Sequence, residues 1–147
     1  ANHEVRYNCT IIDLHDRSVI ANITDRNITS DLAIRTLRKA LESQPTIKEG
    51  LILHSDQGSQ YTSKAFTEFC ESVNVTQSMS KAGYPYDNAP MERYFNTLKN
   101  ECTNLYEFTT EETLYQKVEE FAYVDYNHVR PHSYNGYRTP YEARTAA

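Results

Sequence analysis

The order of apolar and polar residues divides the first third of the chain into a hairpin and a helix. Residues 5–12 and 18–24 are rich in β-branched side chains and predict two antiparallel strands joined by a short turn. Ser30 then offers a helix cap, and residues 32–41 carry apolar side chains at helical spacing. We expect this amphipathic helix to end before Pro45, because proline cannot continue a helix.

Strands and helices continue to alternate along the rest of the chain. We expect, in order, a short buried strand at 51–55, a helix capped by Thr62 or Ser63 and ending near 73, a strand at 75–79, a loop at 80–88, and helices at 92–104 and 110–126. Strands interleaved with helices indicate an α/β layer fold with a mixed β-sheet flanked by helices. No internal repeat or low-complexity linker interrupts the pattern, so a single domain over residues 1–147 suffices.

Two acidic residues stand in local sequences that suit metal binding. Asp56 ends the apolar run and is followed by the turn-prone residues 57–59, so its carboxylate should project from the tip of a strand. Glu92 lies in the first turn of a predicted helix, where Asn88 is a plausible cap and Pro90 suits the first helical positions. The two carboxylates would therefore sit at the ends of two rigid elements.

Carboxylates on separate rigid elements are typical ligands of Mg²⁺ or Mn²⁺, which prefer oxygen and keep waters that substrate phosphates can replace. The chemistry expected of such a site is phosphoryl transfer, and a two-metal site normally requires a third carboxylate. Two other readings remain open on spacing alone. Ser-Asp-x-Gly is a common turn and a first-turn glutamate can simply offset the helix dipole, while an acid and base pair could serve a metal-independent glycosidase.

The sequence around these residues carries a more specific signal. It lies in five segments: 54–63 (HSDQGSQYTS), 86–92 (YDNAPME), 96–101 (NTLKNE), 126–133 (YNHVRPHS) and 139–142 (TPYE). Together they resemble the catalytic core of bacterial insertion-sequence transposases, which is similar to retroviral integrases. The resemblance implies an RNase H-like fold, a catalytic Asp-Asp-Glu triad, and metal-dependent cleavage and joining of DNA ends. It also implies Mg²⁺ or Mn²⁺ as cofactor, transposon ends and target DNA as partners, and a homo-oligomer as the active form.

The resemblance assigns roles to individual residues. Asp56 and Glu92 correspond to catalytic, metal-binding positions, and five residues are candidates for contact with DNA: Gln60, Tyr86, Asn88, Asn96 and Lys99. Asn96 and Lys99 lie four and seven residues after Glu92, so an α-helix would carry all three on one face. A solvated surface lysine is the alternative for Lys99.

The chain departs from the family pattern at its beginning. In the family the first aspartate lies on an opening strand, whereas residues 5–12 match the second strand. We therefore expect a core truncated at its N-terminus, without the first strand and the first catalytic aspartate. Asp13 is the one candidate substitute ligand, but the matching family position belongs to a structural turn. The truncation also keeps open a noncatalytic DNA-binding or assembly module.

Charge and cysteine content qualify these expectations. The chain has 147 residues and a net charge of −5, which opposes nonspecific DNA binding. The excess acid falls in the last third, so weak DNA affinity and a reliance on other parts of a longer protein are expected. Three widely spaced cysteines predict neither a disulfide framework nor a zinc ribbon. No apolar run is long enough for a membrane span, and we expect a cytoplasmic protein.

Overall fold

The computed structural model describes residues 5–44, 50–81, 89–104, 108 and 110–146. It begins with the predicted hairpin, in which β1 (Tyr7–Ile12) pairs with β2 (Val19–Asp25) in antiparallel register. The register shifts between Ile11 and Ile12, and the turn places Arg17 at a φ of 65°, a left-handed conformation that is uncommon for a non-glycine residue. The hairpin is thus confirmed, with a β-bulge and a strained turn at its tip.

Helix α1 (Ser30–Ser43) follows the hairpin and packs its apolar stripe against it. The predicted cap at Ser30 is wrong by one residue. Thr29 has the extended backbone of an N-cap, and its hydroxyl accepts a hydrogen bond from the Leu32 N–H at 3.1 Å. The helix ends before Pro45, as predicted from the sequence.

A second pair of strands follows α1 in the sequence. β3 (Ile52–Ser55) and β4 (Thr76–Met79) run parallel, and α2 (Ser59–Thr62) and α3 (Lys64–Ser72) connect them. Ser63 caps α3 by accepting a hydrogen bond from the Phe66 N–H, which confirms one of the two predicted caps. A helical connection is what a parallel pair of neighbouring strands requires.

Helices make up the last third of the described chain. They are α4 (Ala89–Leu98), the π-helical segment η2 (Lys99–Thr103), α5 (Glu111–Glu120), the π-helical segment η3 (Phe121–Val129), the 3₁₀ turn η4 (Ser133–Asn135) and α6 (Pro140–Thr145). The predicted helices at 92–104 and 110–126 are confirmed in type, although each changes to π-helical spacing in its second half. The predicted cap Asn88 lies outside the described residues.

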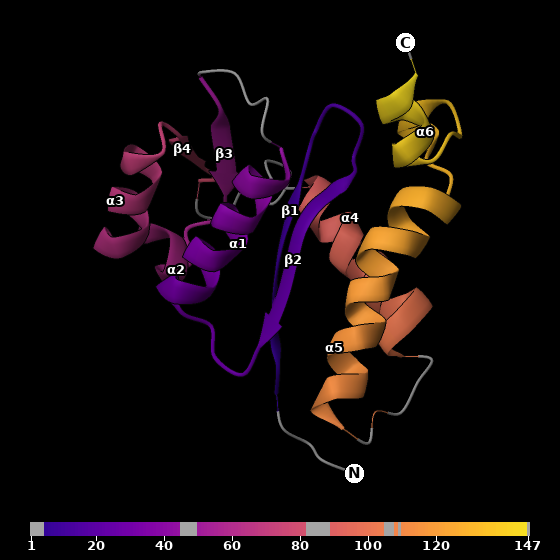
Figure 1. Cartoon of the computed structure of the whole chain (residues 1–147), viewed down its shortest axis with the longest axis horizontal. Helices are drawn as coiled ribbons and strands as arrows, with labels where there is room; N and C mark the ends of the chain where they lie inside the picture. The colour runs from indigo at the N-terminus through magenta and orange to yellow at the C-terminus, as the bar shows by residue number, and fades with distance from the viewer. Residues whose placement is uncertain (1–4, 45–49, 82–88, 105–107, 109, 147) are drawn as a thin grey trace.

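The hairpin separates two hydrophobic clusters (Figure 1). On one side, α1 and α3 enclose Leu37, Phe66 and Cys70. On the other side, α4, α5 and η3 pack around Tyr94, which has no exposed surface. The chain is therefore an α/β protein with helices on both sides of its strands. The expected mixed sheet is divided, since the four described strands form two separate two-stranded sheets, one antiparallel and one parallel.

Candidate functional site

Asp56 lies in a tight turn directly after β3. Its Oδ1 accepts a hydrogen bond from the Gly58 N–H at 2.8 Å, which fixes the orientation of the carboxylate. No other described residue donates to its Oδ2, and no described basic residue forms an ion pair with it. The side chain is exposed. Asp56 is thus held by its Oδ1 and leaves its Oδ2 without a described donor, on a side chain exposed to solvent. The sequence predicted this position for a carboxylate at a strand tip.

Hydrogen bonds to the end of β4 hold this turn in place. The Gln57 side-chain amide donates to the Ser80 carbonyl at 3.0 Å, and the Ser80 N–H donates to the Ser55 carbonyl at 2.8 Å. The two ring nitrogens of His54 lie 2.9 Å from the Ser78 and Ser80 hydroxyls. Because Ser55 and Ser80 are buried, these bonds exchange little with water and keep the turn rigid.

Gly58 lets Gln60 approach Asp56. A Cβ at position 58 would lie 2.9 Å from Asp56 Oδ1 and 2.7 Å from Gln60 Oε1, closer than real Cβ contacts come. The backbone at Gly58 has an ordinary φ of −57°, so a larger residue is not excluded by conformation, but its Cβ would displace the ends of the Asp56 and Gln60 side chains. Gln60, a candidate for DNA contact, is therefore brought next to the Asp56 carboxylate.

Glu92 occupies the first turn of α4 and is exposed. Pro90 and Met91, the residues just before it, line the same cavity as Asp56 and Gln60. Tyr94 anchors the helix in the core two residues later, through edge-on packing against Tyr126 at a ring distance of 5.0 Å. The start of α4 and the Asp56 turn therefore border one cavity, although 35 residues separate Asp56 from Glu92 in the sequence.

Asp56 lines this cavity and Glu92 directly follows two residues that line it, and both carboxylates suit a divalent cation, but the described set of ligands is incomplete. Asp56 and Glu92 are exposed carboxylates without basic partners among the described residues, which is the donor chemistry that Mg²⁺ and Mn²⁺ prefer. Within the described ranges, however, no group of three or more His, Cys, Asp or Glu residues could hold a metal ion. The third ligand that a two-metal site normally requires is not supplied by the described residues.

Asp13 is engaged elsewhere. Its Oδ2 accepts a hydrogen bond from Arg144 at 3.1 Å, and its Oδ1 accepts one from the His15 N–H at 2.9 Å. The same guanidinium reaches Gln44 at the C-terminal end of α1, which immediately precedes the segment leading to β3. Asp13 and Asp56 both line the cavity, but the Asp13 carboxylate is taken up by Arg144. No group of three or more possible metal ligands in the described part of the chain includes it.

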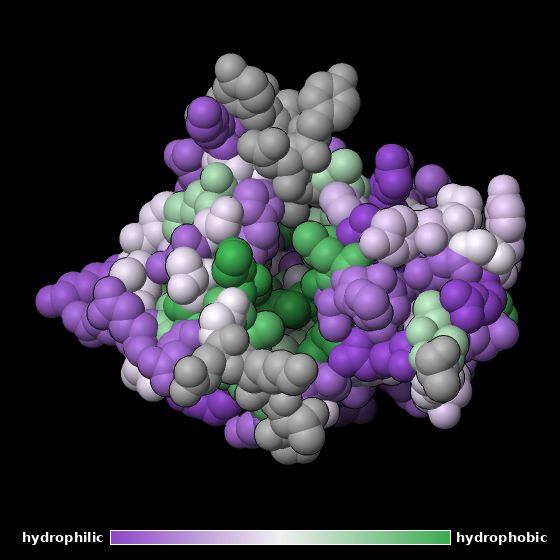
Figure 2. Space-filling model, turned by 90° about the horizontal axis from the view of Figure 1, so that it is seen from above, coloured by the Kyte–Doolittle hydropathy of each residue, from purple (hydrophilic) through white to green (hydrophobic). Residues whose placement is uncertain are grey.

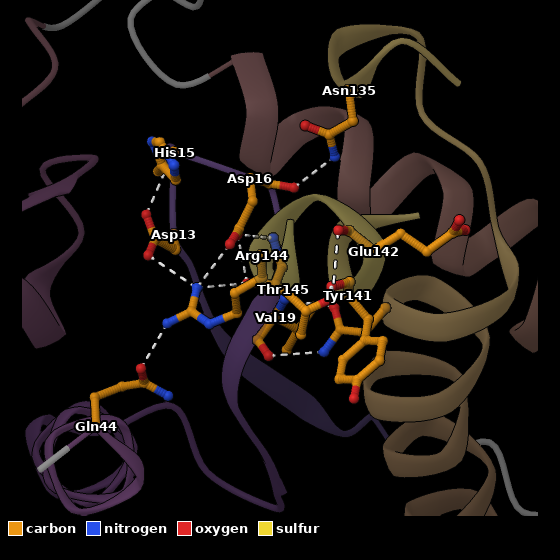
Figure 3. Close-up of polar contacts among 12 residues, drawn as sticks. Asp13, His15, Asp16, Val19, Gln44, Asn135, Tyr141, Glu142, Arg144 and Thr145 are labelled. Atoms are coloured by element: carbon orange, nitrogen blue, oxygen red, sulfur yellow. Dashed lines mark hydrogen bonds and ion pairs between the residues drawn. The ribbon is translucent and has the colours of Figure 1, made fainter. Parts of the chain in front are cut away.

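Arg144 forms the centre of a polar cluster that sequence reasoning missed (Figure 3). Besides Asp13 it contacts Asp16 Oδ2 at 2.8 Å and the Ser18 hydroxyl at 3.1 Å. Asp16 is only 1% exposed, so α6 supplies the positive charge for a buried carboxylate at the hairpin turn. The partners are more than 120 residues apart in sequence, so no local pattern announces this contact.

The candidate DNA-contact residues are distributed as follows. Asn96 and Lys99 are exposed, like Glu92, whereas Tyr94 and Leu98 on the opposite side of the helix are buried. Lys99 opens the π-helical segment, and its carbonyl accepts from the Asn104 N–H at 2.8 Å. The Glu92-to-Lys99 spacing therefore stays α-helical, and the shared exposed face agrees with the prediction. Tyr86 and Asn88 lie outside the described residues.

All three cysteines are buried and unpaired, as expected for structural thiols. Burial raises the pKa of Cys9, which also lies 3.5 Å from the Tyr61 hydroxyl. Burial likewise raises the pKa of Tyr61 far above its ordinary value. None of the described helices is both long enough and apolar enough to cross a membrane.

Comparison with known proteins identifies the family. The integrase core domain matches residues 1–85, and a second integrase core domain profile matches residues 73–140. The transposase InsF of insertion sequence IS3A from Escherichia coli (strain K12) is 34% identical over 134 residues, which cover 91% of this chain and 46% of that protein. The chain thus spans about half the length of the curated relatives it matches.

Solved structures share the fold at low sequence identity. A chain of the simian T-cell lymphotropic virus intasome in complex with PP2A regulatory subunit B56 gamma matches with a TM-score of 0.73 and 17% identity, over 95% of this chain and 48% of that one. The HTLV-2 integrase catalytic core domain in complex with magnesium, in a trimeric form, matches with a TM-score of 0.59 and 18% identity, over 90% and 80%. These likenesses confirm the expected RNase H-like fold. Because the first integrase core domain profile matches more than half of the residues of this chain, the chain belongs to the integrase core domain family. This membership confirms its resemblance to insertion-sequence transposase cores.

Proposed function

We propose that this chain is the catalytic core of a metal-dependent polynucleotidyl transferase that cleaves and joins DNA ends during transposition. The observation that carries the proposal is the Asp56 turn, where a hydrogen bond from Gly58 orients a carboxylate beside the cavity that the start of α4 also borders. Family membership supports the reaction class, and the insertion-sequence relatives support transposition as its setting. The insertion-sequence relatives come from bacteria, whose DNA lies in the cytoplasm, so a cytoplasmic location is part of the proposal.

Asp56 and Glu92 are the residues that would hold Mg²⁺ or Mn²⁺. When bound, the ion supplies positive charge to the phosphodiester oxygens during an in-line displacement. The chain's own contribution is to orient Asp56 through the Gly58 N–H and to carry Glu92 on a helix that Tyr94 anchors in the core. Groups held in this way need no rearrangement when the substrate arrives.

DNA would follow the exposed face of α4. Lys99 lies about 10 Å along the helix axis from Glu92 at 1.5 Å per residue, a distance suited to the next phosphates of the same strand. Asn96 lies between them, and Gln60 stands beside Asp56. Tyr86 and Asn88 belong to the same proposed contact set on the strength of the sequence resemblance. We also propose that the active form is a homo-oligomer, because a chain with the same fold is part of a viral intasome and an integrase core with this fold forms a trimer.

The test is DNA cleavage and strand transfer by a longer form of the protein that supplies a third carboxylate. Asp56→Asn and Glu92→Gln should each abolish Mg²⁺-dependent activity while DNA binding persists. Glu119→Gln, at an exposed acid of α5, is the matched control and should act like the wild type. Lys99→Ala should weaken DNA-end binding. It should also reduce the slope of log affinity against log salt concentration by about one, the value for one lost phosphate contact. Full activity of Asp56→Asn or Glu92→Gln would refute the assignment.

A noncatalytic DNA-binding or assembly module is the second candidate. It is favoured by one observation, the absence of a three-carboxylate group among the described residues. For the 147-residue chain alone we expect weak divalent-metal binding and no detectable strand transfer. If the longer protein also binds DNA and oligomerises but does not cleave it under any divalent metal, the module is the correct reading.

A further inference from the structure

The imidazole of His54 joins the two strands that lead to the candidate site. His54 lies directly opposite Ser78 in the parallel pair of β3 and β4, and its Nδ1 lies 2.9 Å from the Ser78 hydroxyl. The ladder between the strands ends one residue later, at Ser55 and Met79. The Nε2 atom lies 2.9 Å from the Ser80 hydroxyl. The imidazole therefore carries the connection between the strands past the end of the ladder.

A histidine suits this place because its two ring nitrogens point in different directions. Ser78 and Ser80 are two residues apart, so their side chains leave the same face of the chain about 6.5 Å from each other. A neutral imidazole has one ring N–H and one bare nitrogen, and each serine hydroxyl can either donate or accept. A side-chain amide carries both of its polar atoms at one end, so it would serve one of the two hydroxyls and not both.

Ser80 connects this imidazole to the turn that carries Asp56. Its N–H donates to the Ser55 carbonyl at 2.8 Å, and its carbonyl accepts from the Gln57 side chain at 3.0 Å. It therefore bonds to the residues on both sides of Asp56. Ser80 is only 7% exposed, and among the described residues His54 is the partner of its hydroxyl. Removal of that partner would leave a buried hydroxyl without a hydrogen bond, which favours local opening.

The surroundings of His54 strengthen these hydrogen bonds. His54 borders the same cavity as Asp56 and as Met91 at the start of α4. Hydrophobic residues surround the hollow in the middle of the molecule (Figure 2), and polar contacts beside an apolar surface compete less with water. β4 ends directly before Ser80, and the chain then continues to α4 and Glu92. Ser80 thus adjoins the Asp56 turn and stands near the start of the connection to the second carboxylate.

We infer that His54 is a positioning residue for the Asp56 carboxylate, and that its contact with Ser80, not the one with Ser78, does the positioning. Both ring nitrogens are engaged by serines, so His54 acts on the carboxylate through the end of β4 and the turn. The inference rests on the proposed role of Asp56 as a metal ligand. The Gly58 N–H reports on it directly, because this group holds Asp56 Oδ1 at 2.8 Å.

The first test uses NMR of the 147-residue chain without metal. His54→Phe keeps a planar ring but removes both contacts. Amide hydrogen exchange at Ser80 should become roughly tenfold faster, and the Gly58 amide proton should shift upfield as its bond to the carboxylate weakens. Exchange at Thr76, whose N–H bonds to β3 at the other end of the strand pair, should not change. Equal acceleration at Thr76 would indicate a general loss of stability and would overturn the proposal, as would an unmoved Gly58 signal.

Two conservative variants separate the two ring contacts. Glutamine carries its amide about as far from the backbone as Nε2, so His54→Gln should keep the Ser80 contact and behave like the wild type. Asparagine carries its amide nearer, at the place of Nδ1, so His54→Asn should keep the Ser78 contact alone and behave like His54→Phe. Ser78→Ala is the matched control and should leave Ser80 exchange and the Gly58 signal unchanged. The opposite order of the glutamine and asparagine variants would contradict the assignment to Ser80.

A Mn²⁺ titration of the same variants connects the turn with the metal site. His54→Phe and His54→Asn should bind Mn²⁺ about tenfold more weakly than the wild type, within the range expected for the loss of an outer contact, and His54→Gln should restore the affinity. Unchanged affinity in a variant whose Gly58 signal has moved would also overturn the proposal. If the wild type itself gives no Mn²⁺ response, the proposed metal site is wrong. The measurements without metal then still decide whether His54 holds the turn.

Discussion

At the scale of single residues, the candidate site depends on Gly58, which has no side chain. Gly58 leaves room for the Asp56 carboxylate and the Gln60 amide to stand side by side, and its N–H fixes one carboxylate oxygen. Both functions come from an ordinary turn sequence. The turn is therefore part of the proposed metal site and is not only a connection between β3 and α2.

Gly58→Ala should weaken Mn²⁺ binding on the order of tenfold, the usual effect of disturbing the groups that orient a metal ligand. The new methyl group would displace Asp56 Oδ1 and Gln60, while the backbone needs no change. Gly136→Ala is the matched control. Position 136 has open space but a φ of 63°, so alanine should lower stability by about 1–2 kcal/mol and leave Mn²⁺ binding unchanged. Isothermal titration and thermal unfolding of both variants measure the two effects. Unaltered Mn²⁺ affinity in Gly58→Ala would remove Gly58 from the site.

Glu111 should make stability depend on pH in acid. Hydrogen bonds from Arg26, with help from the Tyr115 hydroxyl, lower its pKa from 4.5 to about 2. A carboxylate with a lowered pKa in the folded state adds stability above its unfolded value, and that contribution is lost as pH falls through the folded value. Glu111→Gln should therefore lower the thermal midpoint at neutral pH, and the difference from the wild type should close between about pH 4.5 and 2. Glu112→Gln, at an exposed neighbour without an ion pair among the described residues, is the matched control and should leave the thermal midpoint at neutral pH unchanged. Parallel curves for Glu111→Gln and the wild type would contradict the assigned ion pair.

At the scale of elements, helix α6 acts as a clamp through Arg144. Its guanidinium bonds to Asp16 and Ser18 at the hairpin turn and to Gln44 at the end of α1. The capping box of Thr139 and Glu142 fixes the start of this six-residue helix, so the arginine is presented from a defined position. Helix α6, near the end of the described chain, thus holds the hairpin turn to the end of α1.

Arg144→Met should lower the free energy of unfolding by about 1–3 kcal/mol, because it leaves the buried Asp16 carboxylate with the Ser18 donors alone. Asp13→Asn is the matched control, since it removes an exposed partner of the same arginine and should change stability by less than about 1 kcal/mol. Urea denaturation of both variants distinguishes them. Equal losses would show that Asp16 does not depend on the arginine.

Local sequence patterns predicted the type of most elements. The hairpin, the strand before Asp56, the amphipathic α1 and the cap Ser63 follow from features within a few residues. The cap of α1 was misplaced because Ser30 and Thr29 are both good caps, and only the backbone angles decide between them. Helix α6 was missed, although its Thr-Pro-x-Glu start is a recognisable signal, because six residues carry no helical periodicity.

The candidate site divides in the same way. The exposed carboxylate of Asp56 after a strand was predictable, since turn residues follow it directly. The shared cavity of Asp56 and the start of α4 was not, because it depends on how separate elements pack. Nor could local patterns show that Arg144 occupies Asp13, or that the sheet is split into two halves.

At the scale of the whole molecule, strands and helices surround a central cavity. Among the described residues each sheet has only two strands, and a cavity of about 570 Å³ is lined by residues of both sheets. The net charge of −5 gives the chain little nonspecific attraction for DNA. Both features agree with a core that works as part of a longer polypeptide.

The most direct test of the account is a Mn²⁺ titration of the isotopically labelled chain, followed by NMR. Paramagnetic Mn²⁺ broadens the signals of nuclei near it, so even weak binding is visible. We predict that amides after Asp56 and those around Glu92 broaden together at the same Mn²⁺ concentration, and that EDTA reverses both. Asp56→Asn should remove the broadening around Glu92 as well as the broadening after position 56. Glu92→Gln should likewise remove the broadening in both segments. If either variant leaves the other segment's response intact, the two carboxylates do not share an ion, and the proposed site is wrong.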